Sequence, residues 1–216
     1  MRKIDKSEQH STAYRSWENN LETNNLPHPP YNSSNGEYYK DIVMDVLRCQ
    51  NGLCAYTEVQ LCPPQYLTAE SWENGRYSLE IRAYNGQLEH FDESLKYKGV
   101  GTEHKDWLWS NFFVINSDTN IIKKAQKVDD ILKPDGVDYD PFRLLDYSFE
   151  THQYIASYDF DNDTRKRIKY MINLLGLNFP NVVDKRRQVV ERIVKYPFER
   201  DFEREFPTAV AFYEHS

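Results

Sequence analysis

Apolar residues recur every three or four positions in four parts of the chain, which is the period of an amphipathic helix. These parts are residues 38–49, about 164–175, about 180–196 and, in shorter pieces, 199–214. Gly176 and Pro197 follow the second and third parts, and neither residue type readily continues a helix. A mainly helical C-terminal part is therefore expected.

Other segments show the period of two or the β-prone composition that favours strands. The expected strands are 78–84, 87–91, 111–116, 143–148 and 153–158. Asn85-Gly86 is a hairpin-turn signal after the first of them. Residues 117–120 supply helix N-cap residue types before a helix expected over 121–128. The middle of the chain is thus predicted to hold two strands followed by a helix.

The first 36 residues are polar and are interrupted by Pro27, Pro29 and Pro30. This pattern predicts an extended arm that wraps the core or a partner. We expect an α+β fold with an arm over 1–36, a core domain over 37–160 and a helical region over 161–216.

Size and composition narrow the class of protein. The chain has 216 residues, of which 39% are hydrophobic, so it can bury a core and is not a disordered protein. No apolar run approaches a membrane span, and the first residues lack the apolar stretch of a signal peptide. Its three cysteines lie within 49–62 and do not form a disulfide framework. We therefore expect a cytoplasmic protein without a membrane partner.

Four residues in the middle of the chain have a spacing typical of one-metal nucleases. Glu89 and His90 end an apolar run, Asn111 follows 21 residues after the histidine, and Asn120 follows nine residues later. An oriented imidazole, with an ordinary pKa of about 6.5, can take a proton from water at neutral pH. Carboxylate and amide oxygens suit Mg²⁺ or Mn²⁺, and an amide can brace a loop because it donates and accepts. His90, Asn111 and Asn120 are the expected catalytic residues, with Glu89 and Asn120 as metal ligands and Asn111 as the brace.

Each residue also has an ordinary structural interpretation. A Glu-His pair is typical of a surface ion pair, Asn111 of a turn and Asn120 of a helix N-cap. Asp92 and Asp118 are further oxygen donors that could replace the chosen ligands. His104 is a competing histidine, which we expect in a Gly-rich loop on the solvent or substrate side.

Four segments resemble the HNH endonuclease subunit of Septu-type anti-phage systems, which also occurs as a retron-associated effector. The first is GLCAYTE at 52–58, and the second is EHF at 89–91 with Lys96 downstream. The third runs from Asp106-Trp107 to Ser110-Asn111, and the fourth runs from Thr119-Asn120 to Lys123. Similarity continues to about residue 196 through ILKP at 131–134, DP at 140–141, INLLGLN at 172–178 and RR at 186–187. The resemblance implies a ββα-metal core of the HNH or His-Me finger type, Mg²⁺-dependent cleavage of nucleic acid, and an SMC- or ABC-like ATPase partner.

The chain departs from that family at the cysteine pairs that hold a structural zinc ion. The first pair is reduced to Cys54-Ala55-Tyr56-Thr57, the second is replaced by residues 116–119, and no cysteine follows Cys62. A structural zinc site needs four nitrogen or sulfur ligands, so none is expected. We expect packing of large apolar side chains to hold the hairpin instead, from Trp107, Trp109, Phe112, Phe113 and Ile115.

Charge is distributed unevenly. Residues 163–196 carry nine Lys and Arg against three acids, although the whole chain has a net charge of −7. A second basic cluster, 123–127, lies on the predicted helix of Asn120. Clustered basic residues attract phosphates, although solvated helix faces carry the same pattern. The expected nucleic-acid contacts are Lys123, Lys124, Arg165, Arg167, Arg186 and Arg187.

These observations predict a metal-dependent HNH endonuclease that acts on DNA or tRNA, as the effector subunit of an anti-phage complex with an ATPase. The alternative is a catalytically inactive subunit that keeps the HNH scaffold as a nucleic-acid- or protein-binding module. The lost cysteine pairs and the acidic net charge favour this alternative. A metal-independent RNA-binding module is a third interpretation.

Overall fold

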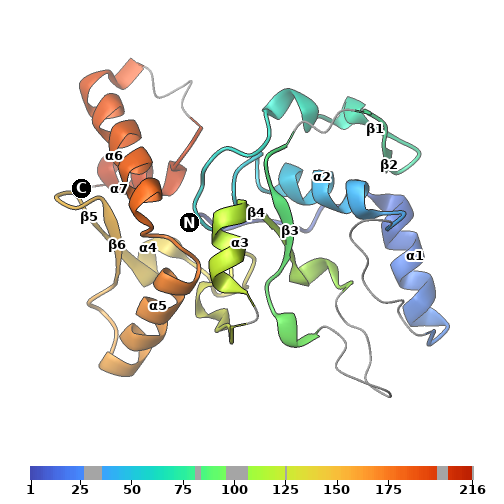
Figure 1. Cartoon of the computed structure of the whole chain (residues 1–216), viewed down its shortest axis with the longest axis horizontal. Helices are drawn as coiled ribbons and strands as arrows, with labels where there is room; N and C mark the ends of the chain where they lie inside the picture. The colour runs from blue at the N-terminus through green and yellow to red at the C-terminus, as the bar shows by residue number, and fades with distance from the viewer. Residues whose placement is uncertain (27–35, 81–83, 96–106, 125, 199–203, 216) are drawn as a thin grey trace.

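The computed structural model describes residues 1–26, 36–80, 84–95, 107–124, 126–198 and 204–215. In these residues it confirms an α+β fold with small antiparallel sheets (Figure 1). The helices are α1 Thr12–Thr23, α2 Tyr39–Cys49, α3 Ser117–Lys123, α4 Pro141–Leu144, α5 Asn162–Leu174, α6 Pro180–Lys195 and α7 Pro207–Glu214. The strands are β1 Trp72–Glu73, β2 Arg76–Tyr77, β3 Gln87–His90, β4 Phe112–Ile115, β5 Leu145–Ser148 and β6 Gln153–Ala156.

The strands β3 and β4 form an antiparallel pair near the middle of the molecule, and α3 follows β4 directly (Figure 1). All four residues of β4 are buried, which explains why this segment is apolar at every position. Gln50, at the end of α2, holds the backbone of β4 because its side chain donates to the Val114 carbonyl at 2.8 Å and accepts from the Val114 amide at 2.8 Å. A strand–strand–helix unit is therefore fixed on α2.

Two local predictions around this unit were wrong. Helix α3 begins at Ser117 rather than at 121, because the Asn116 side chain caps it by accepting from the Thr119 amide. Ser78–Glu80 and Tyr84 are not in a strand, and 81–83 lie outside the described residues. The preceding hairpin is β1–β2, whose turn at Asn74-Gly75 has positive φ at both residues, as a type I′ turn requires.

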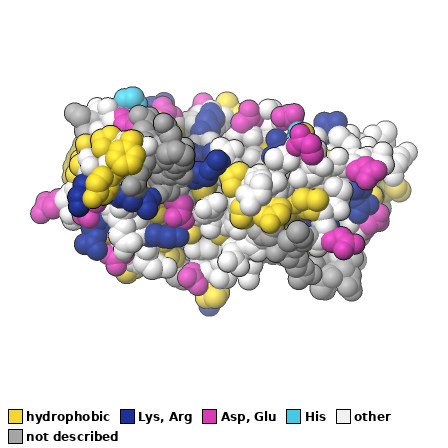
Figure 2. Space-filling view, turned by 90° about the horizontal axis from the view of Figure 1, so that it is seen from above, with side chains coloured by type: hydrophobic (Ala, Val, Ile, Leu, Met, Phe, Trp, Pro, Cys, Tyr) yellow, Lys and Arg dark blue, Asp and Glu magenta, His cyan; other side chains and the backbone are white. Residues whose placement is uncertain are grey.

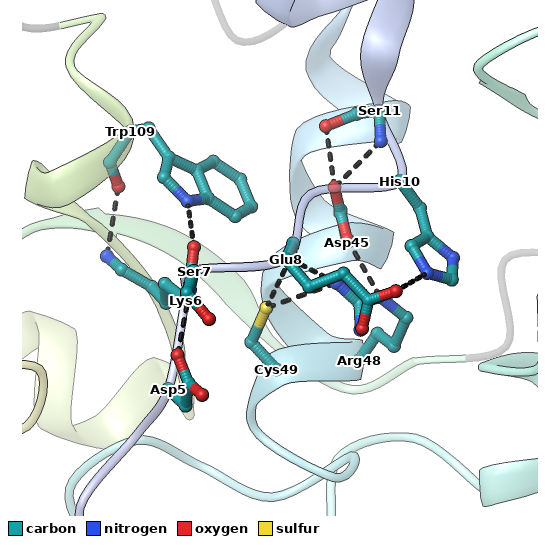
Figure 3. A network of polar contacts seen from close by, with 10 residues as sticks. All are labelled: Asp5, Lys6, Ser7, Glu8, His10, Ser11, Asp45, Arg48, Cys49 and Trp109. Atoms are coloured by element: carbon teal, nitrogen blue, oxygen red, sulfur yellow. Dashed lines mark hydrogen bonds and ion pairs between the residues drawn. The ribbon is translucent and has the colours of Figure 1, made fainter.

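The expected extended arm over 1–36 is also wrong, because α1 occupies part of it and 27–35 lie outside the described residues. Before the helix, residues 1–11 form no helix or strand, and the apolar Met1 and Ile4 are buried. Figure 3 shows how this segment joins α2 to Trp109. Lys6 donates to the Trp109 carbonyl at 2.9 Å, and Ser11 donates to the buried Asp45 carboxylate. The N-terminal segment is therefore part of the core.

The C-terminal region is mainly helical, as predicted, and follows the β5–β6 hairpin at one end of the molecule (Figure 1). Helix α5 packs on β6, and α6 packs on α7. Buried residues of this region continue the hydrophobic core of the β3–β4–α3 unit. The two regions therefore share one core.

Candidate functional site

His90 lies at the end of β3, and its side chain is 1% exposed. Its strand partner is Phe112, and the two rings contact each other edge-on with centroids 5.1 Å apart. Because side chains alternate along a strand, His90 leaves β3 on the face opposite to Glu89. The imidazole is thus held in place by packing.

Glu89 forms a buried ion pair that the sequence interpretation did not include. The Lys123 ammonium, at the end of α3, lies 2.5 Å from the Glu89 Oε1 atom, and both side chains are 2% exposed or less. The same ammonium donates to the His90 carbonyl oxygen at 3.2 Å. A buried charge needs such partners, because desolvation without them is costly. Lys123 therefore neutralises one of the two expected metal ligands.

Asn111 makes the pair of hydrogen bonds expected of a brace. It is 3% exposed, its Oδ1 atom accepts from the Asp92 amide at 2.8 Å, and its Nδ2 atom donates to the Asp92 carbonyl at 3.2 Å. Its own carbonyl accepts from the Phe91 amide at 2.9 Å. The turn that follows His90 is therefore fixed to the start of β4.

Asn120 lies on α3 and faces the same side of β3 as Glu89. Its amide donates to the Gln87 Oε1 atom at 2.9 Å, and Gln87 lies two residues before Glu89. Residues two apart on a strand share a face, so α3 lies against the face of β3 that carries the exposed Gln87 and the buried Glu89. The sequence analysis did not predict that Gln87 accepts a hydrogen bond from Asn120. The two-residue spacing of Gln87 and Glu89 on one strand indicates that both side chains lie on the same face.

The donor types at this face suit a hard divalent cation. Glu89 offers a carboxylate and Asn120 an amide oxygen, which Mg²⁺ and Mn²⁺ accept together with several waters. Because the Lys123 ammonium already contacts the Glu89 carboxylate, a divalent cation there competes with this lysine. Among the described residues, no group of three or more His, Cys, Asp or Glu side chains is arranged to hold a metal ion.

Aromatic packing surrounds the hairpin. Phe113 lies 6.0 Å from the ring of Tyr56 and 6.0 Å from that of Phe91, and Trp107 meets Phe112 edge-on at 6.5 Å. Cys54 and Cys62 are buried free thiols, and the Cys54 sulfur accepts from the Thr57 amide. Lys96, His104 and Asp106 lie outside the described residues.

Two of the six residues expected to contact nucleic acid are buried. Lys123 pairs with Glu89 as described. Arg186 is 0% exposed, donates to the carbonyl oxygens of His152 and Leu177, and lies 4.3 Å from the Tyr154 ring centroid. In these positions neither side chain can reach a phosphate at the surface. The prediction that Lys123 and Arg186 contact nucleic acid is therefore wrong.

The other four basic residues lie at or near the surface. Lys124 is exposed, and Arg165 is half-buried with its guanidinium 4.4 Å from the Tyr158 ring. Arg167 and Arg187 are exposed and pair with Asp129 and Asp184. The hydrogen bonds that Arg167 donates to the Asp129 carboxylate raise the pKa of Arg167. Figure 2 shows basic and hydrophobic side chains together at the end of the molecule that holds α5 and α6.

No protein-family model matches the chain, and no curated protein matches it significantly. None of the described helices combines the length and the apolarity that a membrane span requires.

Proposed function

We propose that the chain is a metal-dependent HNH-type endonuclease that hydrolyses phosphodiester bonds. The observation that carries this proposal is the Asn111 amide, which pairs with both backbone groups of Asp92 immediately after Glu89 and His90. It does so within a unit of two strands and a helix, and the helix brings Asn120 to the face of Glu89. Glu89 and Asn120 thus share one face of β3, whereas the adjacent His90 leaves the strand on the other face. The proposal therefore requires the imidazole to act at the strand end, where the two faces meet.

In the proposed reaction, the His90 imidazole takes the proton from an attacking water molecule. Asn111 holds the turn that follows His90, and Glu89 and Asn120 would hold Mg²⁺ or Mn²⁺. When bound, the ion supplies positive charge at the leaving oxygen. Lys123 must withdraw from Glu89 before the carboxylate can act as a ligand, so the ion pair would keep the site inactive until then.

We propose DNA or tRNA as the substrate, with Lys124, Arg165, Arg167 and Arg187 in contact with phosphates. The net charge of −7 opposes binding to free nucleic acid. Delivery by an ATPase partner subunit in an anti-phage complex would overcome this repulsion. The partner is proposed from the family resemblance alone.

Cleavage of plasmid DNA and of tRNA tests this function, with Mg²⁺ or Mn²⁺ and with any ATPase that co-purifies with the chain. We expect His90→Ala to abolish cleavage while the circular dichroism spectrum stays unchanged. His10→Ala is the matched control, because His10 lies in the N-terminal segment and contacts Glu8 instead. If His90→Ala cuts as fast as the wild type, His90 is not the base.

A second candidate is a binding subunit that keeps this scaffold without its chemistry. The buried Glu89–Lys123 pair and the packing of His90 against Phe112 favour it, because the acid is neutralised and the imidazole is covered. Nucleic-acid affinity that a chelator leaves unchanged, without cleavage in any complex tested, would identify this function.

A further inference from the structure

A surface between α3 and α5 carries three lysines around one tyrosine. Lys124 follows the end of α3, Lys127 lies three residues later, and Lys169 and Tyr170 lie in the second half of α5. The Tyr170 hydroxyl donates to the Lys127 carbonyl oxygen at 2.5 Å. The turn Asp130–Leu132, which comes shortly after Lys127, packs on α5. Residues from two distant segments of the chain therefore form one surface here.

The three lysines are open to a ligand. Their side chains are exposed, and none of their ammonium groups forms a hydrogen bond or an ion pair with another described residue. Two further cations on α5 differ in this respect, because Lys166 pairs with Asp163 and Arg167 pairs with Asp129. Three positive charges of this surface are thus left without a counter-charge from the protein.

The acids beside these lysines carry less weight. The Asp129 carboxylate accepts two hydrogen bonds from Arg167, at 2.6 and 2.8 Å, and these bonds lower the pKa of Asp129. The Asp163 carboxylate lies 2.9 Å from the Lys166 ammonium. Asp130 is exposed and has no such partner among the described residues. Three unpaired ammonium groups therefore face one unpaired carboxylate, and the local charge complements that of phosphate although the whole chain is acidic.

Tyr170 adds an aromatic ring to this surface. Its side chain is 43% exposed, and the bond from its hydroxyl to the Lys127 carbonyl fixes the position of the ring. Nucleobases stack on exposed aromatic rings, while lysines nearby contact the phosphates of the same strand. In a duplex the bases already stack on one another, so stacking on a protein ring requires an unpaired strand.

We propose that this surface binds single-stranded nucleic acid, with a base stacked on Tyr170 and the neighbouring phosphates on the three lysines. This inference rests on the proposed function and deepens it, because it names an unpaired strand as the form of the substrate. Lys124 directly follows Lys123, whose ammonium pairs with Glu89, so a strand held here begins beside a proposed metal ligand.

Fluorescence anisotropy of the full chain, at low salt and with EDTA, tests this surface without cleavage. The labelled probes are oligo(dT), oligo(rU), a DNA duplex and an abasic DNA strand, each about 12 nucleotides long. We expect at least one of the two single strands to bind about fivefold or more tightly than the duplex and the abasic strand, because only the single strands offer free base faces. The tighter of the two single strands shows whether the surface prefers DNA or RNA.

Variants separate stacking from charge. Tyr170→Leu should weaken binding of the preferred single strand about fivefold or more, whereas Tyr170→Phe keeps the ring and should bind like the wild type. Phe149→Leu is the matched control, because Phe149 is 42% exposed but lies in the β5–β6 turn next to the acidic Glu150. Lys127→Gln and Lys169→Gln should each reduce the slope of log affinity against log salt by about 0.7.

The competing outcomes are distinct. The proposal is overturned if neither single strand binds at a chain concentration of about 0.1 mM, or if Tyr170→Leu binds as tightly as the wild type. An abasic strand or a duplex that binds as tightly as the preferred single strand would also overturn it, because phosphates alone would then account for the affinity. Binding that depends on Tyr170, in a chain that cleaves nothing, would support this surface and reject the nuclease. Cleavage together with binding that does not depend on Tyr170 would do the reverse.

Discussion

Lys123 and Arg186 are both wholly buried cations, but their surroundings differ. Lys123 pairs with a carboxylate at the candidate site, whereas Arg186 donates to two backbone carbonyl oxygens and lies against the Tyr154 ring. A carboxylate can exchange one cation for another, but a cage of carbonyl oxygens and aromatic rings fits one guanidinium. The comparison indicates that Lys123 is placed where another cation can compete, and that Arg186 has a structural role.

The largest effect is expected from Arg186→Ala. Two buried carbonyl oxygens would lose their donor at roughly 1–3 kcal/mol each, and a cavity would remain, so we expect a loss of about 3–5 kcal/mol in the free energy of unfolding. Urea denaturation measures this change. Arg187→Ala, at the exposed neighbouring position, should change stability by less than about 0.5 kcal/mol. Equal stability of the two variants would contradict a structural role for Arg186.

Lys123→Met tests the buried ion pair between Lys123 and Glu89. It removes the ammonium that pairs with the buried Glu89 carboxylate, which should cost about 3 kcal/mol. The double variant with Glu89→Gln should recover most of this loss, because the buried charge that Lys123 compensates is then absent as well.

Divalent cations sharpen this test. If Glu89 and Asn120 form a metal site, millimolar Mn²⁺ should stabilise Lys123→Met by about 1–2 kcal/mol and stabilise the double variant much less. Urea denaturation with and without Mn²⁺ measures both effects. Absence of any Mn²⁺ effect on Lys123→Met would favour the binding subunit over the endonuclease.

Glu18 is a third buried charge, an acid that accepts hydrogen bonds from the Tyr14 hydroxyl and from the Trp109 backbone. Burial raises the pKa of Glu18 from 4.5 to about 7. The folded state therefore binds one proton more than the unfolded state between these values, so stability falls as pH rises through this window. We expect Glu18→Gln to remove about 1–3 kcal/mol of this pH dependence, after allowance for the partial exposure of the group. Unfolding curves at pH 5 and pH 8 would show it, and parallel curves for both chains would contradict it.

The smallest effect concerns the exposed basic residues. If Arg187 contacts a phosphate, Arg187→Gln should reduce the slope of log affinity against log salt by about 1. Its ion pair with Asp184 is exposed, so the expected change in stability is less than about 1 kcal/mol. Fluorescence anisotropy with labelled DNA at several salt concentrations measures the slope. An unchanged slope would remove Arg187 from the proposed phosphate-binding surface.

Much of the fold could be predicted because it depends on local signals. The helices α2, α5 and α6 and the strand pairs β3–β4 and β5–β6 all lie within a few residues of their predicted positions. The prediction failed at α1, where the polar sequence conceals the burial of Tyr14 and Leu21. Such burial depends on contacts with distant segments, which periodicity alone does not reveal.

For the candidate site, the spacing of Asn111 was sufficient to predict that its amide would brace a loop. The sequence did not reveal that Lys123 would turn inward to Glu89 or that Gln87 would bind Asn120. A basic residue on a short helix has the same pattern whether it faces solvent or a carboxylate. The direction that α3 takes across β3 decides between these two outcomes.

The amino-acid sequence by itself determined the α+β class, the helical C-terminal part and the hairpin–helix order, because these follow from periodicity, caps and turns. Tertiary structure alone decided which charges are buried and which acids already have a cation. The physical reason is that the environment of a charge depends on residues far away in the chain: Lys123 comes 34 residues after Glu89, and Arg186 comes 34 residues after His152.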